Sequence, residues 1–338
     1  MTYPFGWSVV KQILLRRERW PGGLKVKGIP LVYPGQEVQA DQPVIRIERA
    51  GLVDEKTSAA RSSVSAAPIS AAAMDNGTGN SSNGVRSGET ILAGLRGRVV
   101  DITRRGGVVI ESRAAVVQGA IGVGGQVAGV LTMWQASDGN RGQQSILPGT
   151  ILVIPGPLNL AMLRQAMSSG ISGVIASSIS SRDLEGFLRT DLLQLVGTRN
   201  VELAQAHLPP ITLLLTEGPG TLAMPARTMQ LLGQYQGSIA LLSGATSVQQ
   251  WIFPELVISL PIKEAQEHWN PAHPDPVLAV GAQVRVCGGE YEGAIGEINH
   301  LFTHQQVFTA GIRARAARLR LENGSTLVIP MTLIERIG

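Results

Sequence analysis

Apolar and polar residues alternate with two different periods along this chain. A period of two, typical of half-buried β-strands, runs through residues 23–48, 97–112 and 318–330. Between residues 145 and 262, short apolar runs such as TILVIP and SGVIASS alternate with segments of helical period. The pattern therefore predicts β-rich modules on either side of a central α/β domain.

Helix signals within residues 145–262 indicate a layered domain. The segment LNLAMLRQAMSSG ends at Gly170, and Ser180 and Asp183 have the spacing of a capping pair. A further helix is expected from about Pro225 to Gln236. The apolar face of the first helix consists of Leu158, Met162, Leu163, Ala166 and Met167. Because strands alternate with helices, we expect a largely parallel sheet covered on both faces.

Two breaks in composition set the expected domain boundaries. Residues 51–89 consist mainly of Ala, Ser, Gly and Asn and cannot offset their own ordering entropy, so a mobile linker is expected there. Residues 263–276 are rich in proline and charge and mark a second linker. We therefore expect a β-rich domain over residues 1–144, the α/β domain over 145–262 and a small β-barrel over 277–338.

Basic residues are concentrated near the N-terminus. Six bases and one acid lie between residues 11 and 27, whereas the whole chain has a net charge of only +4. The apolar residues of this segment fit one stripe of a short helix: Val9, Val10, Ile13 and Leu14. Arg16, Arg17 and Arg19 could meet anionic lipid, RNA or an acidic partner protein there. The alternative is a solvated helix that packs against its own protein.

One N-terminal stretch carries a family resemblance. PGQEVQADQPVIRIE, residues 34–48, resembles the half-motif of barrel-sandwich hybrid domains, the small β fold of lipoyl and biotinyl carriers, and residues 97–112 could supply the other half. Carriers present a lysine between two methionines, and this sequence has no such tripeptide. The resemblance therefore implies a structural or docking use of the fold.

The glycine-rich stretch GAIGVGGQVAG, residues 119–129, is read as tight β turns. A dinucleotide-binding loop would need a third glycine where Val127 stands, and a helix where VLTMW favours a strand.

The C-terminal segment VGAQVRVCGGEYEGAIGEI, residues 280–298, resembles the KOW motif of ribosomal proteins and of NusG-type transcription elongation factors. The matching positions are Gly281, Val284, Val286, Gly289, Gly293, Gly296 and Ile298. The resemblance implies a small SH3-like barrel that contacts RNA or protein. Downstream, Asn323 and Gly324 suit a type I′ turn between two alternating strands, and MTLIERI would close the barrel.

Four arginines of this module are the candidates for partner binding. They are Arg313, Arg315, Arg318 and Arg320. Acidic residues nearly cancel the positive charge of the module, and only 4% of the chain is aromatic, so base-stacking platforms are expected to be scarce. Protein docking is therefore at least as well supported as RNA contact.

The carboxyl ends of the expected parallel strands are the place for a ligand in an α/β domain. The loops there offer small residues, hydroxyls and one carboxylate, and the candidates are Gly156, Ser177, Ser178, Glu217, Gly218 and Gly220. Helix N-termini could hold a small anionic metabolite, but Pro157 and Pro219 each remove an amide donor. Alternatively, Glu217 is structural and bonds to backbone amides of its glycine loop.

The sequence gives no positive argument for catalysis, a cofactor or a metal. No nucleophile is paired with a base, and the spacing of His300 and His304 loses its force in a loop between strands. Cys287 is expected to be a small buried residue at a strand end.

A chain of 338 residues with 44% apolar content can fill two or three cores. The single cysteine suits a reducing compartment, the N-terminus has the reverse order of a secretory signal, and no stretch reads as a membrane span, so a cytoplasmic location is expected.

Our first hypothesis is a multidomain binding or scaffold protein associated with RNA, the ribosome, transcription or a larger complex; DNA is not expected as a partner. The alternatives are an enzyme or metabolite sensor and a peripheral membrane component. The combination of modules also resembles uncharacterised bacterial proteins, which brings no activity with it.

Overall fold

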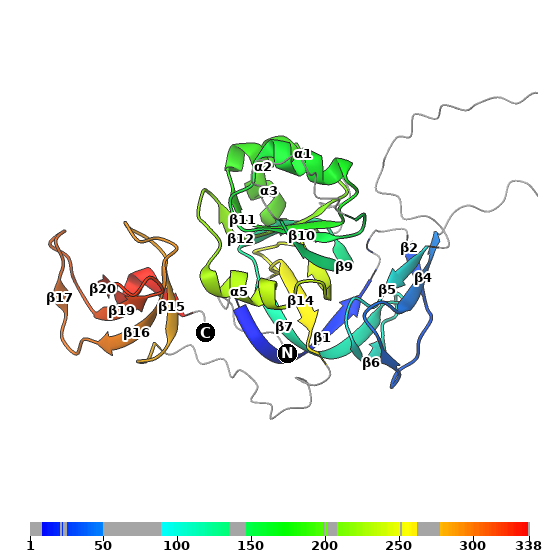
Figure 1. Cartoon of the computed structure of the whole chain (residues 1–338), viewed down its shortest axis with the longest axis horizontal. Coiled ribbons are helices and arrows are strands. Elements are labelled where there is room, and N and C mark those ends of the chain that lie inside the picture. The colour runs from blue at the N-terminus through cyan, green and yellow to red at the C-terminus, as the bar shows by residue number, and fades with distance from the viewer. Residues whose placement is uncertain are drawn as a thin grey trace, which may run out of the picture.

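The computed structural model describes residues 9–20, 22, 26–49, 89–134, 147–198, 200–201, 208–250, 252–261 and 278–336. Strands dominate this part of the chain, and the helices lie between residues 160 and 234 (Figure 1). The segment expected to be a linker at residues 263–276, and all but the last residue of that at 51–89, lie outside the described residues.

The N-terminal basic segment is a strand, so the helix expected there is wrong. Strand β1 (Val9–Arg19) pairs antiparallel with β7 (Val108–Gln118) along its length. Its register shifts between Val10 and Ile13, and beyond this irregularity every second side chain is buried, at Ile13, Leu15 and Arg19 with Arg17 half-buried. A bulge of this kind spaces apolar residues as a helix would, which explains the error.

The segments on both sides of residues 50–88 share one core. Strands β2 (Val26–Pro30), β4 (Pro43–Arg49) and β5 (Thr90–Leu92) form a three-stranded antiparallel sheet, and β3 (Glu37–Val38) pairs with β6 (Gly97–Ile102). Buried residues from the two segments pack together: Val32, Val38, Val44 and Ile45 with Ala93, Leu95 and Val99.

The central sheet is mixed and curls back on itself. Its further strands are β8 (Ile121–Val123), β9 (Gln126–Met133), β10 (Ile151–Ile154), β11 (Gly173–Ile179), β12 (Thr212–Pro219), β13 (Ile239–Ser243) and β14 (Glu255–Ser259). Only β9 to β12 are parallel neighbours. The order runs from β7 through β14, β13, β9, β10, β11 and β12 to β8, which follows β7 after two residues. The sheet thus crosses the boundary expected at residue 145.

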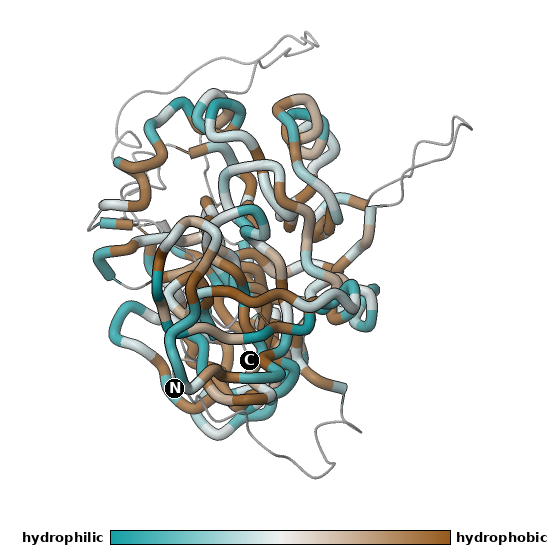
Figure 2. The backbone as a smooth tube through the Cα atoms, turned by 90° about the vertical axis from the view of Figure 1, so that its left-hand side faces the viewer, coloured by the Kyte–Doolittle hydropathy of each residue, from teal (hydrophilic) through white to brown (hydrophobic). Residues whose placement is uncertain are grey.

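Alternate side chains of this sheet enter different cores. Ile151 and Val153 face an inner core with Leu231 of helix α5 (Ala226–Gln234), whereas Leu152 and Ile154 face the outer helices. Those helices are α1 (Leu160–Ser168), α2 (Ser181–Leu188) and α3 (Leu192–Val196), grouped above the sheet in Figure 1. In Figure 2 the apolar segments are concentrated in the middle of the fold, and many of the outer turns are hydrophilic. Helices therefore pack against this sheet, but the sheet is mixed, so the largely parallel sheet expected from the sequence is wrong.

Two features predicted from the local sequence, a helix cap and a glycine turn, are present in this domain. Ser180 Oγ accepts a hydrogen bond from the backbone amide of Asp183 at 3.1 Å, so the expected cap is confirmed. The glycine-rich stretch forms the turn between β8 and β9, with Gly124 at φ +93°, as its reading as a β turn requires.

The C-terminal residues form a five-stranded antiparallel sheet in the order β20, β19, β16, β15, β21. The strands are β15 (Gln283–Val286), β16 (Ile295–Leu301), β19 (Ala316–Leu321), β20 (Thr326–Pro330) and β21 (Ile334–Arg336), with the 3₁₀ helix η2 (Met331–Leu333) before the last. A separate hairpin pairs β17 (Gln306–Val307) with β18 (Arg313–Ala314).

Two glycines of this module serve different purposes, one within a strand and one in a turn. A Cβ at Gly296 would lie 2.7 Å from the carbonyl oxygen of Arg320, so the glycine lets β16 and β19 approach each other closely. The hairpin at Asn323 and Gly324 is also present, but Gly324 alone has positive φ. A type I′ turn needs positive φ at both positions, so that turn type is wrong.

Among the helices of the described ranges, none combines the length and the apolar character needed to cross a membrane.

Candidate functional sites

An exposed face of the C-terminal sheet brings aromatic and basic side chains together. The register places His300 of β16 opposite Arg318 of β19, and Arg318 opposite Val328 of β20. All three are exposed. A register shift between Ile298 and His300 turns the histidine to this face. We call His300, Phe302, Arg318 and Val328 the arginine–aromatic face.

Phe302 lies at the centre of this face. The Arg318 guanidinium carbon is 5.5 Å from the centre of the Phe302 ring, within the range of a cation–π contact. The ring centres of His300 and Phe302 are 4.8 Å apart with an interplanar angle of 87°, an edge-to-face arrangement. The expectation that stacking platforms are scarce therefore misses two rings that the fold places side by side.

The charges of this module are separated in space although they nearly cancel in sum. Among its described arginines, Arg313, Arg315 and Arg318 are exposed and have no ion pair, whereas Arg320 pairs with Glu297 at 2.9 Å. The acidic loop of residues 289–293 lies on the other side, where Gly293 meets Leu222 of the central domain. In Figure 1, β17 is the outermost strand and β15 lies nearest the central sheet. The outermost hairpin therefore carries Arg313, which lies opposite Val307 of β17.

A second candidate site lies where the C-terminal sheet meets the end of β12. Arg285 Nη1 lies 3.5 Å from Glu217 Oε2, and Arg285 Nε donates a hydrogen bond to Glu335 Oε1 at 2.7 Å. The Glu217 side chain is only 3% exposed, and that of Arg285 24%. Burial raises the pKa of Glu217, although the neighbouring Arg285 charge opposes the rise. The expected bonding of Glu217 to backbone amides is wrong, because its charged partner comes from another module.

A β-bulge concentrates unpaired polar atoms beside Glu217. In the pairing of β11 with β12, Ala176 lies opposite Leu215 and Ser178 opposite Gly218, so Thr216 and Glu217 face Ser177 alone. Three buried atoms here have no hydrogen-bond partner in the described structure: Ser177 Oγ, Thr216 Oγ1 and Glu217 Oε1. Bulges re-aim side chains in this way beside functional sites.

The remaining strand-end candidates line the same region without adding charge. Ser178 Oγ donates a hydrogen bond to the carbonyl of Leu222 at 2.8 Å. Gly218 and Gly220 have φ of +83° and +143°, and a Cβ at Gly156 or Gly220 would meet open space. The charged group at these strand ends is a carboxylate, which repels an anion. The geometry thus gives the expected anionic metabolite no support here.

The N-terminal arginines bind partners of their own chain rather than forming one free basic surface, although Arg16 itself is exposed. Arg16 Nε lies 2.7 Å from Glu111 Oε2, and Arg17 binds both carboxylate oxygens of Glu255. Arg19 is only 2% exposed, too buried to contact a partner. Sequence reasoning made these residues candidates for contact with an anionic partner, because their pairing with β7 is a long-range feature that the local pattern does not reveal.

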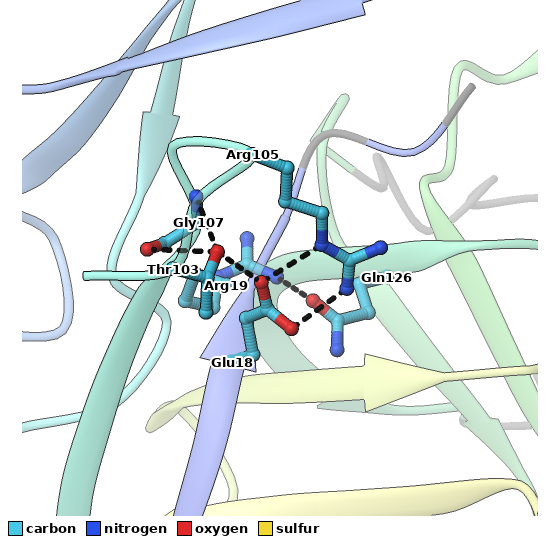
Figure 3. Close-up of polar contacts among 6 residues, drawn as sticks. All are labelled: Glu18, Arg19, Thr103, Arg105, Gly107 and Gln126. Atoms are coloured by element: carbon cyan, nitrogen blue, oxygen red, sulfur yellow. Dashed lines mark hydrogen bonds and ion pairs between the residues drawn. The ribbon is translucent and has the colours of Figure 1, made fainter. Parts of the chain in front are cut away.

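Arg19 is a buried charge bound by neutral acceptors. Its Nε donates a hydrogen bond to the Leu92 carbonyl at 3.1 Å, and its Nη1 donates one to Gln126 Oε1 at 2.9 Å. Figure 3 shows the bond to Gln126. Burial lowers the pKa of Arg19 from its usual value to about 10. These two bonds tie β1 to the end of β5 and to β9, so Arg19 joins the N-terminal β module to the central sheet.

Glu18 on the same strand points to the other side, toward the turn after β6. Arg105 and Thr103 both donate hydrogen bonds to its carboxylate, at 2.9 and 2.7 Å to Oε1 (Figure 3). Burial favours the neutral carboxyl, but these hydrogen bonds outweigh it and lower the pKa of Glu18.

Metal and thiol chemistry find no geometric basis in the described residues. Within those ranges no group of three or more His, Cys, Asp or Glu side chains could hold a metal ion. Cys287 is exposed, so its expected burial is wrong. Partial burial and the nearby Glu335 carboxylate raise the pKa of the thiol, which makes it a poorer nucleophile.

Comparison of the chain with protein families, with curated proteins and with solved structures finds no match.

Proposed function

We propose that this chain is a multidomain binding protein that contacts single-stranded RNA through its arginine–aromatic face. The C-terminal sheet is, in this proposal, a KOW-type SH3-like barrel, and its strand order with a 3₁₀ turn before the last strand supports that assignment. The N-terminal β module is its barrel-sandwich-like companion. The observation that carries the proposal is the packing of Arg318 over Phe302 beside His300.

Single-stranded RNA suits this face for two physical reasons. Aromatic rings on an open sheet can stack with bases, and each such contact contributes about 1–3 kcal/mol without demanding a particular sequence. Arg313, Arg315 and Arg318 have no carboxylate partner within the described structure and are free to meet phosphates. Affinity should therefore depend on both stacking and salt.

Two substitutions in the full chain separate the contribution of phosphate contacts from that of base stacking. Arg318→Gln removes one phosphate contact and should flatten the salt dependence of log Kd by about 0.7, the value for one contact in a single strand. Phe302→Leu keeps apolar packing but removes the ring, and should weaken binding by roughly tenfold at unchanged salt dependence. Arg182→Gln, at an exposed position of α2, is the matched control.

The measurement is fluorescence anisotropy of a labelled uridine dodecamer titrated with each protein at several salt concentrations. The proposal predicts that only the two C-terminal variants differ from the parent protein. It is overturned if all four proteins bind equally, or if the parent shows no affinity even at low salt. Capture of a protein by the same face after nuclease treatment would instead favour protein docking.

A further inference from the structure

A cavity of about 800 Å³ lies in the helical layer, away from both sites described above. It is open to solvent on one side and is bordered by α1, the ends of α2 and α3, and residues 208–210. Its apolar lining comes from buried side chains of the outer core: Phe187, Leu188, Leu195 and Leu208. A volume of this size is typical of sites for small organic ligands.

Two arginines from different helices stand at the rim of this cavity. Arg164 belongs to α1 and Arg189 follows α2, and both are exposed. Neither forms an ion pair with any carboxylate of the described ranges. The positive charge at the rim is thus uncompensated.

The acidic residues on either side of Arg189 in the sequence already accept hydrogen bonds from the backbone of α3. Glu185 Oε1 accepts a hydrogen bond from the amide of Leu192 at 3.3 Å. Asp191 Oδ1 accepts from the amides of Leu193 and Gln194, at 2.8 and 3.1 Å. Because these carboxylates are engaged with the start of α3, the two arginines keep their charge available for a ligand.

The backbone at Arg189 gives an independent indication of function. Arg189 has φ +56° and ψ +33°, and it is the single non-glycine residue with positive φ in the described structure. Glycine is the usual residue at such a position after a helix, and a side chain there costs about 1–2 kcal/mol. Strain of this kind is commonly retained where a side chain has a role in binding.

We propose that this cavity binds a small organic anion with an apolar body. A carboxylate or phosphate head would be held between Arg164 and Arg189, with the side-chain amide of Gln194 at the same rim. The apolar body of the ligand would lie on Phe187 and Leu195. Planar guanidinium groups favour such heads because they donate paired hydrogen bonds. This site does not depend on the RNA-binding proposal.

The test uses octanoate as the anionic probe and octyltrimethylammonium as a cation with the same apolar chain. Calorimetric titration of the full protein should show binding of octanoate and none of the cation. Arg164→Gln and Arg189→Gly should each weaken octanoate binding by about tenfold or more, the loss expected for a hydrogen bond to a charged group. Arg182→Gln, on α2 but outside the cavity, should bind like the parent.

Arg189→Gly also shows whether a loss of binding results merely from a failure to fold. Glycine relieves the backbone strain at this position, so the variant should melt at the same temperature as the parent or higher while losing affinity. The proposal is overturned if the parent does not bind octanoate, if both probes bind equally, or if the two cavity variants bind octanoate as tightly as the parent.

Discussion

Removing the charge of Arg285 should weaken the contact between the C-terminal sheet and β12 in a manner that depends on pH. Arg285 is the cation nearest the buried Glu217 carboxylate, at 3.5 Å, and it also binds Glu335. In Arg285→Met, Glu217 would be left as a buried charge without its partner.

The size of the effect follows from the geometry. At 3.5 Å and an effective dielectric constant of about 20, the gross attraction between the two charges is about 5 kcal/mol. Desolvation of Glu217 offsets part of it, and breaking a buried pair from one side usually costs about 3–5 kcal/mol. Because Arg285 is 24% exposed, we expect roughly 2–3 kcal/mol for Arg285→Met at mildly alkaline pH.

The sign of the pH dependence is fixed by the direction of the pKa shift. The folded-state pKa of Glu217 lies above its unfolded value, so between the two values the folded protein binds more protons than the unfolded chain. Stability from this group is therefore present at acid pH and lost as the pH rises through the folded pKa. Without Arg285 that pKa should rise further, so the cost of Arg285→Met should be largest at alkaline pH and small in acid.

Urea unfolding at acid and alkaline pH, with hydrogen exchange at the amides of β12 and β15, measures this effect locally. Glu217→Gln should cost little, and the double variant Glu217→Gln/Arg285→Met should regain most of the stability lost in Arg285→Met. A cost of Arg285→Met that does not change with pH, or a double variant no more stable than the single one, would refute the reasoning.

Two further predictions concern the other modules. Gln126→Ala removes a neutral acceptor from the buried Arg19 and should lower the unfolding free energy by about 1.5–3 kcal/mol, measured by urea denaturation; a change below about 0.5 kcal/mol would contradict the linking role of Arg19. Gly296→Ala should destabilise the C-terminal sheet, because the new Cβ would lie 2.7 Å from the Arg320 carbonyl oxygen; normal amide protection of β16 and β19 in hydrogen exchange would count against it.

Local chemistry explains what the sequence could predict. The helix that begins after Ser180 carries its own cap, and the strand turn at Gly124 carries its own glycine, so both were identified correctly. The helix expected at residues 9–14 failed because a bulge changed the spacing of apolar residues. Local pattern alone cannot reveal that β1 has a partner at β7.

The candidate sites depend on contacts between distant residues. Phe302 and His300 are near each other in sequence, but their juxtaposition with Arg318 follows from the pairing of β16 with β19. Glu217 meets Arg285 only because two modules pack together. The sequence held a signal for the arginine–aromatic face, because aromatic residues occur in the segment around His300 and His304 that was predicted to be a loop between strands. The spacing of residues along the chain gave no signal for the contact between Glu217 and Arg285.

The most direct test of the RNA-binding proposal is to map where RNA touches the protein. Single-stranded RNA containing 4-thiouridine can be crosslinked to the full chain with ultraviolet light and the attached peptides identified by mass spectrometry. We predict crosslinks at His300 or Phe302. These crosslinks should disappear in Phe302→Leu, because His300 then has no ring partner. They should remain in the control variant Arg182→Gln. Crosslinks confined to β1 or the helical layer, or none at the arginine–aromatic face under conditions where RNA binds, would contradict the proposal.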